Sequence, residues 1–211
     1  MRWPPGAAEN VPPSHLLYLH GFRSSPQSMK ARRMARWAAE RAPGLTFWCP
    51  QLPPSPAEAV RLIEAGIAGW PQDRSAVIGS SLGGWYATVI AERHGWPAVL
   101  LNPAVEPARD LARYIGEQTA WHDPQDRFFF RAEFIDELRA LQPPVPLTRP
   151  PRYHAVIATG DEVLDWREMS ARYPRADGYG GVLVPGSDHA LSDFEDHLPG
   201  LLGFLGFDPA A

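Results

Sequence analysis

The stretch Ala76-Val77-Ile78-Gly79-Ser80-Ser81-Leu82-Gly83-Gly84-Trp85-Tyr86 decides how this chain folds. It opens with a short, partly β-branched apolar run and continues with residues that a helix accepts. Between the two parts stands Gly-x-Ser-x-Gly, the pattern of a sharp strand-to-helix turn with a serine at its tip. In such a turn the serine backbone is strained, and its hydroxyl projects clear of the sheet. The stretch therefore predicts a buried strand, a tight turn and a helix.

The glycines of the pattern indicate which serine stands at the tip. The turn brings together the residues two before and two after the serine, and glycine avoids a collision there. Gly79 and Gly83 hold these positions around Ser81, whereas Ser80 has bulky aliphatic residues at the same offsets. A plain Gly/Ser-rich turn is one alternative. A phosphate-binding loop is another, but no Gly-Lys-Ser/Thr follows. Ser81 is the predicted nucleophile.

The composition is that of an ordinary globular chain, of a size that one domain can fill. Its 211 residues are 45% hydrophobic and 21% charged, with a formal net charge of −4. No block of basic residues invites nucleic acid or an anionic membrane surface, so we expect neither partner. The single cysteine, Cys49, excludes an internal disulfide framework. Because the sequence shows neither a membrane-length apolar run nor a signal pattern, we expect a cytoplasmic protein.

Short apolar runs alternate with helical patterns along the rest of the chain. The predicted strands cover residues 16–19, 45–49, 76–79, 98–102, 155–158 and 182–184. This alternation predicts a compact, mostly parallel six-stranded sheet with helices on both faces. Residues 1–14 are predicted to form an N-terminal tail and residues 15–211 a single domain. An insertion at about residues 103–152 shows helical patterns and no obvious strand, so we expect a small helical cap.

The turn should place Ser81 at the carboxyl edge of the sheet, where functional groups of such sheets gather. A serine hydroxyl needs a base to take its proton, normally a histidine that a carboxylate orients. Asp161 directly follows the fifth predicted strand, and His189 lies in the loop after the sixth. The chain order serine, aspartate, histidine is that of α/β hydrolases. Ser81, Asp161 and His189 are therefore the candidate catalytic residues.

Other residues compete for the roles of base and acid. Four histidines start strands or lie in helices, away from the expected site: His15, His94, His154 and His197. His20 lies at the right edge, but shaping the loop after the first strand suits it better. His122 lies in the predicted cap, and its position alone does not exclude it. Glu162 and Asp165 compete with Asp161, although Asp165 is better placed to cap a helix.

A tetrahedral oxyanion formed at Ser81 needs two hydrogen-bond donors that are fixed in advance. The backbone N–H of Leu82, at the start of the predicted helix, is one candidate. The backbone N–H of Phe22 is the other, because Gly21 lets the loop after the first strand approach closely. On its own, His20-Gly21 is more typical of an ordinary turn at a strand end.

Large apolar side chains around the cap suggest a place for a substrate acyl group. The candidate acyl-pocket residues are Trp85, Trp121, Phe128, Phe129 and Phe130, although core packing is the commoner role for such a phenylalanine run. Residues 189–197 hold two histidines and three carboxylates, but their spacing fits no HExxH metal motif. We therefore expect no metal ion and no cofactor.

Several segments of the chain are shared, in order, with a known family. They include Tyr18-Leu19-His20-Gly21-Phe22, Gly79-Ser80-Ser81-Leu82-Gly83-Gly84, Asn102-Pro103-Ala104-Val105, Thr159-Gly160-Asp161-Glu162 and Asp188-His189-Ala190. Through them the chain resembles the YqiA-type bacterial esterases, small members of the α/β-hydrolase superfamily. The resemblance implies Ser81, Asp161 and His189 as a catalytic triad that hydrolyses carboxylic esters or acyl thioesters. Ser187 and Asp188 depart from the glycine and asparagine usual in the family, which bears on the shape of the pocket.

These observations predict a protein of the α/β-hydrolase fold that acts as a metal-free serine esterase on small-molecule acyl esters. One alternative is an acyl-CoA thioesterase. The other is a non-catalytic protein of the same fold that binds a ligand or a protein partner. No sequence pattern predicts an oligomeric state.

Overall fold

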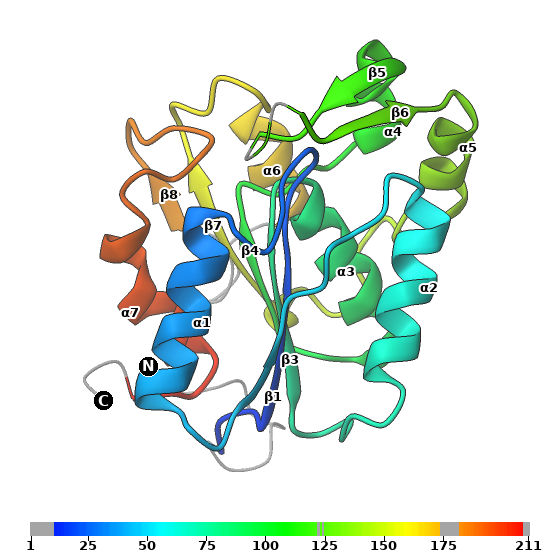
Figure 1. Ribbon diagram of the computed structural model, residues 1–211. Coiled ribbons are helices and arrows are strands. Elements are labelled where there is room, and N and C mark those ends of the chain that lie inside the picture. Colours follow the sequence, from blue (N-terminus) through cyan, green and yellow to red (C-terminus); the bar gives the residue numbers. More distant parts are fainter. Residues whose placement is uncertain (1–10, 122, 124, 174–181, 209–211) are drawn as a thin grey trace.

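Six parallel strands form the sheet at the centre of the molecule (Figure 1). The computed structural model describes residues 11–121, 123, 125–173 and 182–208. In spatial order the strands are β2 (Thr46–Trp48), β1 (His15–Leu19), β3 (Ser75–Ser80), β4 (Ala98–Leu101), β7 (Tyr153–Ala158) and β8 (Val182–Val184). All neighbouring pairs in this sheet are parallel, which confirms the predicted six-stranded sheet. The strand order reverses at β1 and β3, the place where sheets of this kind bind ligands.

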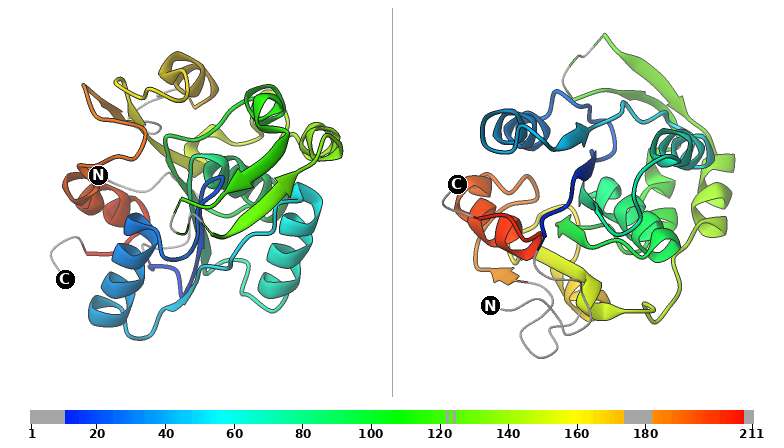
Figure 2. Two further views of the ribbon diagram at one scale, coloured as in Figure 1. Left: turned by 45° about the horizontal axis from the view of Figure 1, so that its top comes forward. Right: turned by 90° about the horizontal axis from the view of Figure 1, so that it is seen from below.

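Helices cover both faces of the sheet, as predicted (Figures 1 and 2). On one face lie α1 (Met29–Arg41) and α7 (Phe194–Phe204). On the other lie α2 (Pro56–Ile67), α3 (Leu82–His94) and α6 (Trp166–Arg172). Successive side chains of a strand point to opposite faces, so Leu16 and Tyr18 pack on the α1 side and Leu17 and Leu19 on the α3 side. Every one of these side chains is fully buried, as an apolar run without alternation predicts.

The start of α2 shows how local sequence fixes an element that borders the site. The Ser55 hydroxyl accepts the backbone N–H of Glu58 at 3.2 Å, and Pro56 stands at the first helical position. Both features stabilise a helix start, because they satisfy or remove backbone donors that lack an intrahelical partner. The Glu137 carboxylate also accepts from the Ser55 hydroxyl and from the N–H of Ala57. The insertion at residues 103–152, which contains Glu137, therefore holds the N-terminus of α2 in place.

The segment between β4 and β7 begins over the carboxyl edge of the sheet and then returns to the opposite edge, where β7 starts (Figures 1 and 2). It contains α4 (Pro107–Asp110), η1 (Ala112–Tyr114), β5 (Gly116–Thr119), β6 (Arg127–Phe130), α5 (Glu133–Ala140) and η2 (Pro150–Arg152). The expectation of a wholly helical cap is wrong, because β5 and β6 pair as an antiparallel hairpin. β5 is polar and half-exposed, so no apolar run marked it as a strand. Residues 1–10 of the predicted tail, and His122, lie outside the described residues.

Two surveys of the described residues bear on expectations about partners. No helix among them is both long enough and apolar enough to cross a membrane. Within the same part of the chain, no cluster of three or more histidine, cysteine, aspartate or glutamate side chains could hold a metal ion.

Candidate active site

Ser81 stands at the tip of the turn that joins β3 to α3. Its backbone has a conformation that residues other than glycine rarely adopt. Its φ is +56° and its ψ is −122°. A Cβ on Gly79 would lie 2.1 Å from the Gly83 carbonyl oxygen, and one on Gly83 would lie 2.0 Å from that of Leu19. Both contacts are with backbone, which cannot move aside cheaply. The sequence pattern therefore exists because the turn, the helix and β1 meet without room for side chains.

Ser81, His189 and Asp161 form a continuous hydrogen-bonded series. The Ser81 Oγ lies 3.0 Å from His189 Nε2, and His189 Nδ1 lies 2.7 Å from Asp161 Oδ2. The other oxygen of Asp161 accepts the backbone N–H groups of Val163 and Leu164, each at 2.8 Å. The Asp161 side chain is 0% exposed and that of His189 is 20% exposed. The carboxylate is thus locked in orientation, while the imidazole faces the open side of the site.

The competing acids and bases occupy other positions. Glu162 accepts the backbone N–H of His189 at 3.0 Å and so fixes the loop rather than the imidazole ring. Asp165 accepts the N–H of Arg167 at 2.9 Å and caps α6. His20 is buried, with Nδ1 3.0 Å from the Gly21 carbonyl oxygen and Nε2 accepting the N–H of Leu52 at 3.1 Å. Its ring therefore braces the loop after β1.

The two predicted oxyanion donors lie on either side of Ser81. A Cβ on Gly21 would approach the Ser81 Cβ to 3.2 Å and its Oγ to 3.7 Å, so the loop after β1 passes directly beside the serine. No hydrogen bond between described residues uses the backbone N–H of Phe22 or of Leu82. Leu82 is the first residue of α3, and N–H groups at a helix start have no intrahelical acceptor. Both groups are therefore available to an external acceptor.

Sequence reasoning gave no role to Asn102, which connects three parts of the site. It follows β4, is 0% exposed and has a φ of +42°. Its Nδ2 donates to the carbonyl oxygens of Asp188 and His189 at 3.0 and 3.1 Å, and its Oδ1 accepts the N–H of Ala158 at 2.7 Å. It ties the histidine loop to the ends of β4 and β7. An asparagine at the carboxyl end of a buried strand is the signal that could have identified it.

A family model fits almost the whole chain. The model of the uncharacterised protein family UPF0227 matches residues 15–206. The chain belongs to the UPF0227 family. This is the YqiA family, so the resemblance found in the sequence is confirmed.

Solved structures place this UPF0227 chain in the α/β-hydrolase fold, as predicted. A structure of the metagenome-derived lipolytic enzymes LipS and LipT aligns with a TM-score of 0.66 at 20% identity, covering 95% of this chain and 98% of the other. Est1E from Butyrivibrio proteoclasticus with bound ferulic acid aligns with a TM-score of 0.66 at 17% identity, covering 96% and 90%. The mouse α/β-hydrolase domain-containing protein 10 aligns with a TM-score of 0.65 at 15% identity, covering 90% of each chain. Likeness at these identities shows the fold alone.

Ser81 and His189 open into a cavity of about 470 Å³, called here the Ser81 cavity. Three cationic side chains line it: Arg23, Lys30 and Arg113. The Lys30 ammonium donates to the Ala190 carbonyl, beside His189. Burial lowers the pKa of Lys30 to about 8, against the opposing effect of nearby carboxylates. The carboxylates of Asp110 and Glu162 line the same cavity, so its walls carry charges of both signs.

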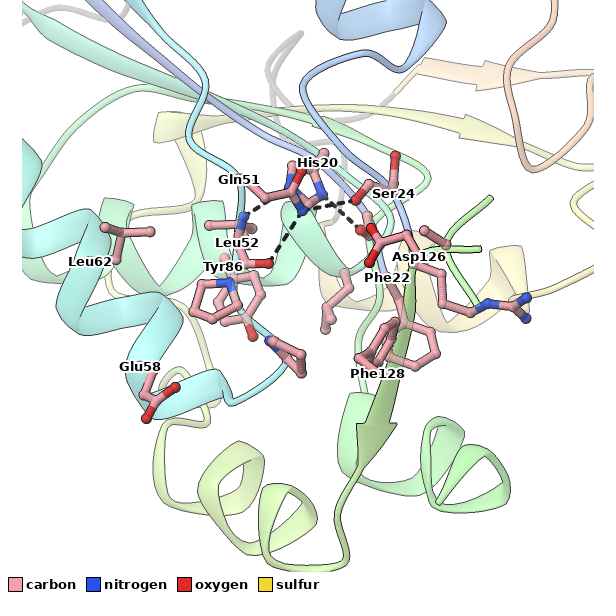
Figure 3. Close-up of a pocket in the computed structure, with 16 residues that line it drawn as sticks. His20, Phe22, Ser24, Gln51, Leu52, Glu58, Leu62, Tyr86, Asp126 and Phe128 are labelled. Carbon is pink, nitrogen blue, oxygen red and sulfur yellow. Dashed lines mark hydrogen bonds between the residues drawn. The ribbon is translucent and has the colours of Figure 1, made fainter. Parts of the chain in front are cut away.

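A second cavity, of about 640 Å³, adjoins the first and lies between α2 and the hairpin (Figure 3). It shares residues 20–24 and Leu82 with the Ser81 cavity. Its remaining walls come from the loop after β2, from α2, from Tyr86 and from the hairpin residue Phe128. The linings of both cavities are mainly apolar, and charged side chains stand in each of them.

The candidate acyl-pocket residues are scattered by the fold. Trp121 lines the Ser81 cavity, 72% exposed beneath the Arg23 guanidinium, and Phe128 lines the second cavity. The expectation is not met for Trp85, Phe129 and Phe130, which line neither cavity. Strand alternation in β6 turns Phe129 outward and buries Phe130 in the core. Trp85 is also core, with its ring N–H on Gln142 at 3.1 Å.

Proposed function

We propose that this chain is a serine hydrolase that cleaves small-molecule carboxylic esters through an acyl-enzyme intermediate. The observation that carries the proposal is the series of contacts at 3.0 and 2.7 Å that joins Ser81 through His189 to Asp161. A hydroxyl, an imidazole and a carboxylate in this arrangement activate the hydroxyl as a nucleophile. Membership of the YqiA family and the structural likeness to lipolytic enzymes and to an esterase domain support the same chemistry.

Acylation begins when the Ser81 oxygen attacks the acyl carbonyl carbon. As the new bond forms, His189 Nε2 takes the hydroxyl proton, and the carbonyl electron pair moves onto oxygen. The N–H groups of Phe22 and Leu82 stabilise this oxyanion, a type of contact worth about 3–4 kcal/mol per donor in related chemistry. The carbonyl then re-forms, the bond to the alcohol oxygen breaks, and His189 donates its proton to the departing alcohol.

Deacylation repeats these steps with water as the nucleophile. His189 takes a proton from water as the water oxygen bonds to the acyl carbon. The bond between the acyl carbon and the Ser81 oxygen then breaks, and His189 returns the proton to that oxygen. Asp161 accepts from Nδ1–H throughout, so it keeps Nε2 free to act as base and stabilises the imidazolium. Its own position is fixed by two backbone N–H groups, each at 2.8 Å. Acid and free serine are the products.

Covalent labelling tests the nucleophile directly. A fluorophosphonate should label the folded wild-type protein at Ser81, and Ser81→Ala should abolish labelling and lower kcat by roughly 10³-fold or more. Ser80→Ala is the matched control and should keep most activity, because the hydrogen bond that His189 Nε2 makes is with Ser81 and not with Ser80. Labelling that maps to Ser80 would move the nucleophile. Folded wild-type protein that resists labelling would favour a non-catalytic binding protein.

The orienting acid has two neighbours that serve as controls. Asp161→Asn should lower kcat by on the order of 10³–10⁴-fold, because the imidazole then adopts the wrong tautomer. Glu162→Gln and Asp165→Asn should retain most activity, since their carboxylates contact backbone N–H groups instead. Full activity in Asp161→Asn together with a collapse in either neighbour would transfer the role. Paired assays with oxygen and sulfur esters of one acyl group would separate an esterase from a thioesterase.

A further inference from the structure

The ring of Phe22 stands where the two cavities meet. Its centroid lies 5.6 Å from that of Tyr114, which lines the Ser81 cavity, and 5.9 Å from that of Phe128, which lines the second cavity. The backbone of Phe22 meanwhile offers one of the two proposed oxyanion donors. Phe22 and Leu82 line both cavities, so the second cavity begins beside the residues that flank Ser81.

The walls of the second cavity select an uncharged ligand. Figure 3 shows Leu62 and Glu58 of α2 on one side and Phe128 and Asp126 of the hairpin on the other. Most of the lining is apolar: Phe22, Leu52, Pro53, Pro54, Leu62, Leu82, Tyr86 and Phe128. The exposed carboxylates of Glu58 and Asp126 would repel a ligand anion. Arg23 on this wall already donates to the Thr119 carbonyl oxygen at 2.6 Å.

The hydroxyl of Tyr86 lines this cavity without a hydrogen bond to another described residue. Tyr86 is 2% exposed, and no hydrogen bond between described residues uses its hydroxyl. Among the described residues, the tyrosine hydroxyl that is fully buried without a partner is that of Tyr18, in the lining of the Ser81 cavity, whereas the Tyr86 oxygen can be reached from its cavity by a ligand or a water. Burial raises the pKa of Tyr86, with a smaller contribution from Glu137, so the phenol stays protonated. It can therefore donate a hydrogen bond to a bound molecule.

We propose that the second cavity is the acyl subsite, and that it takes an uncharged acyl group carrying an oxygen that accepts from the Tyr86 hydroxyl. The proposal rests on ester hydrolysis at Ser81. The acyl group extends from Ser81 past Phe22 and packs between α2 and the hairpin. The alcohol portion stays in the Ser81 cavity, among Lys30 and its cationic neighbours. Ether, hydroxyl or methoxy groups on the acyl chain or ring have the required chemistry.

The Tyr86 contact is tested with 4-nitrophenyl esters of equal acyl length, in which an ether oxygen replaces one methylene at successive positions. For each ether position, the ratio of kcat/KM for the ether ester to kcat/KM for the all-carbon ester is measured in the wild type and in Tyr86→Phe. At one ether position this ratio should be about threefold to tenfold higher in the wild type. Tyr86→Phe removes only the hydroxyl, so the all-carbon ester is an internal reference for packing. Identical ether-to-carbon ratios in both proteins at every position would overturn the Tyr86 assignment.

The location of the acyl group is tested by narrowing each cavity separately. Leu62→Phe should lower the octanoate-to-acetate ratio of kcat/KM several-fold, whereas Val163→Phe in the Ser81 cavity should leave that ratio unchanged. Leu62 is 40% and Val163 is 43% exposed, so both variants should fold. The reverse pattern would place the acyl group in the Ser81 cavity and overturn the subsite. Wild-type protein that hydrolyses no ester would instead overturn the proposed function itself.

Discussion

Replacing Asn102 should weaken both the fold and the rate of catalysis. The residue is wholly buried, and its amide makes three hydrogen bonds at 2.7, 3.0 and 3.1 Å. Asn102→Gly removes all three and keeps a residue that tolerates the φ of +42°. Asn102→Ala removes the same bonds and adds the strain of a left-handed backbone, about 1–2 kcal/mol. The two variants thus separate hydrogen bonding from conformation.

The expected loss of stability in Asn102→Gly follows from the partners that it leaves behind. The N–H of Ala158 would be buried without an acceptor, which costs about 1–3 kcal/mol. The carbonyl groups of Asp188 and His189 belong to half-buried residues, so water can replace part of what they lose, and each bond is worth about 0.5–1.5 kcal/mol. The free energy of unfolding should therefore fall by about 2–6 kcal/mol. In Asn102→Ala the free energy of unfolding should fall further, because the backbone strain adds to the lost hydrogen bonds.

The kinetic effect depends on how far the histidine loop moves. Glu162 still holds the N–H of His189 at 3.0 Å, so the loop should loosen rather than detach. Misplacement of a catalytic group by about 1 Å can cost about 10²-fold, so we expect kcat to fall roughly tenfold to 100-fold with KM little changed. Urea denaturation and steady-state kinetics, both at a temperature where the variant is folded, measure the two effects. Lower stability with unchanged kcat would refute the positioning role, and no change in either would refute the reasoning entirely.

Three further predictions concern backbone space, the core and pH. Gly83→Ala should unfold or inactivate the protein, because its Cβ would lie 2.0 Å from the Leu19 carbonyl oxygen, whereas Gly44→Ala meets nothing within 4 Å and should leave the melting temperature unchanged. Phe130→Ala should cost about 3–5 kcal/mol of stability and Phe129→Ala less than about 0.5 kcal/mol, and equal melting temperatures would contradict the alternation in β6. Burial lowers the pKa of His154 from 6.5 to about 4. As pH falls between these values the unfolded chain binds a proton that the folded chain does not, so stability falls. Urea unfolding at about pH 7 and about pH 5 should show a smaller loss in His154→Gln than in the wild type, and equal losses would contradict this.

The sheet could be predicted from sequence because its signals are local. Each strand is a short apolar run, and parallel strands bring their carboxyl ends to one edge. That rule alone brought residues 28 to 108 positions apart, Ser81, Asp161 and His189, into one predicted site, and their side chains lie within hydrogen-bond distance. Gly79 and Gly83 identified Ser81 as the residue at the tip, because a tight turn has no room for side chains at these two positions and so requires glycine there.

The cavity walls could not be predicted in the same way. Phe128, Phe129 and Phe130 are chemically identical, and the alternation of β6 turns Phe129 to the solvent and the other two to the opposite face. On that face, only the packing of distant segments places Phe128 at the second cavity and Phe130 in the core. β6 was not predicted as a strand, because the segment that pairs with it, β5, is polar and shows no strand pattern. The second cavity itself needs α2 and the hairpin to face each other, a contact between distant segments that no periodicity encodes. Asn102 likewise acquires its role only from three segments that converge on it.

The link between the cap and the loop after β1 couples substrate choice to catalysis in the proposed mechanism. Arg23 adopts a φ of +59°, its carbonyl oxygen accepts the N–H of Trp121 at 2.8 Å, and its guanidinium donates to Thr119 at 2.6 Å. The hairpin therefore holds the residue that follows Phe22 in a strained conformation, and strain of this kind persists only where surrounding contacts maintain it. The same hairpin supplies Phe128 to the second cavity. A change in the cap that reshapes the acyl subsite should thus also shift the Phe22 N–H, so acyl preference and turnover rate should change together.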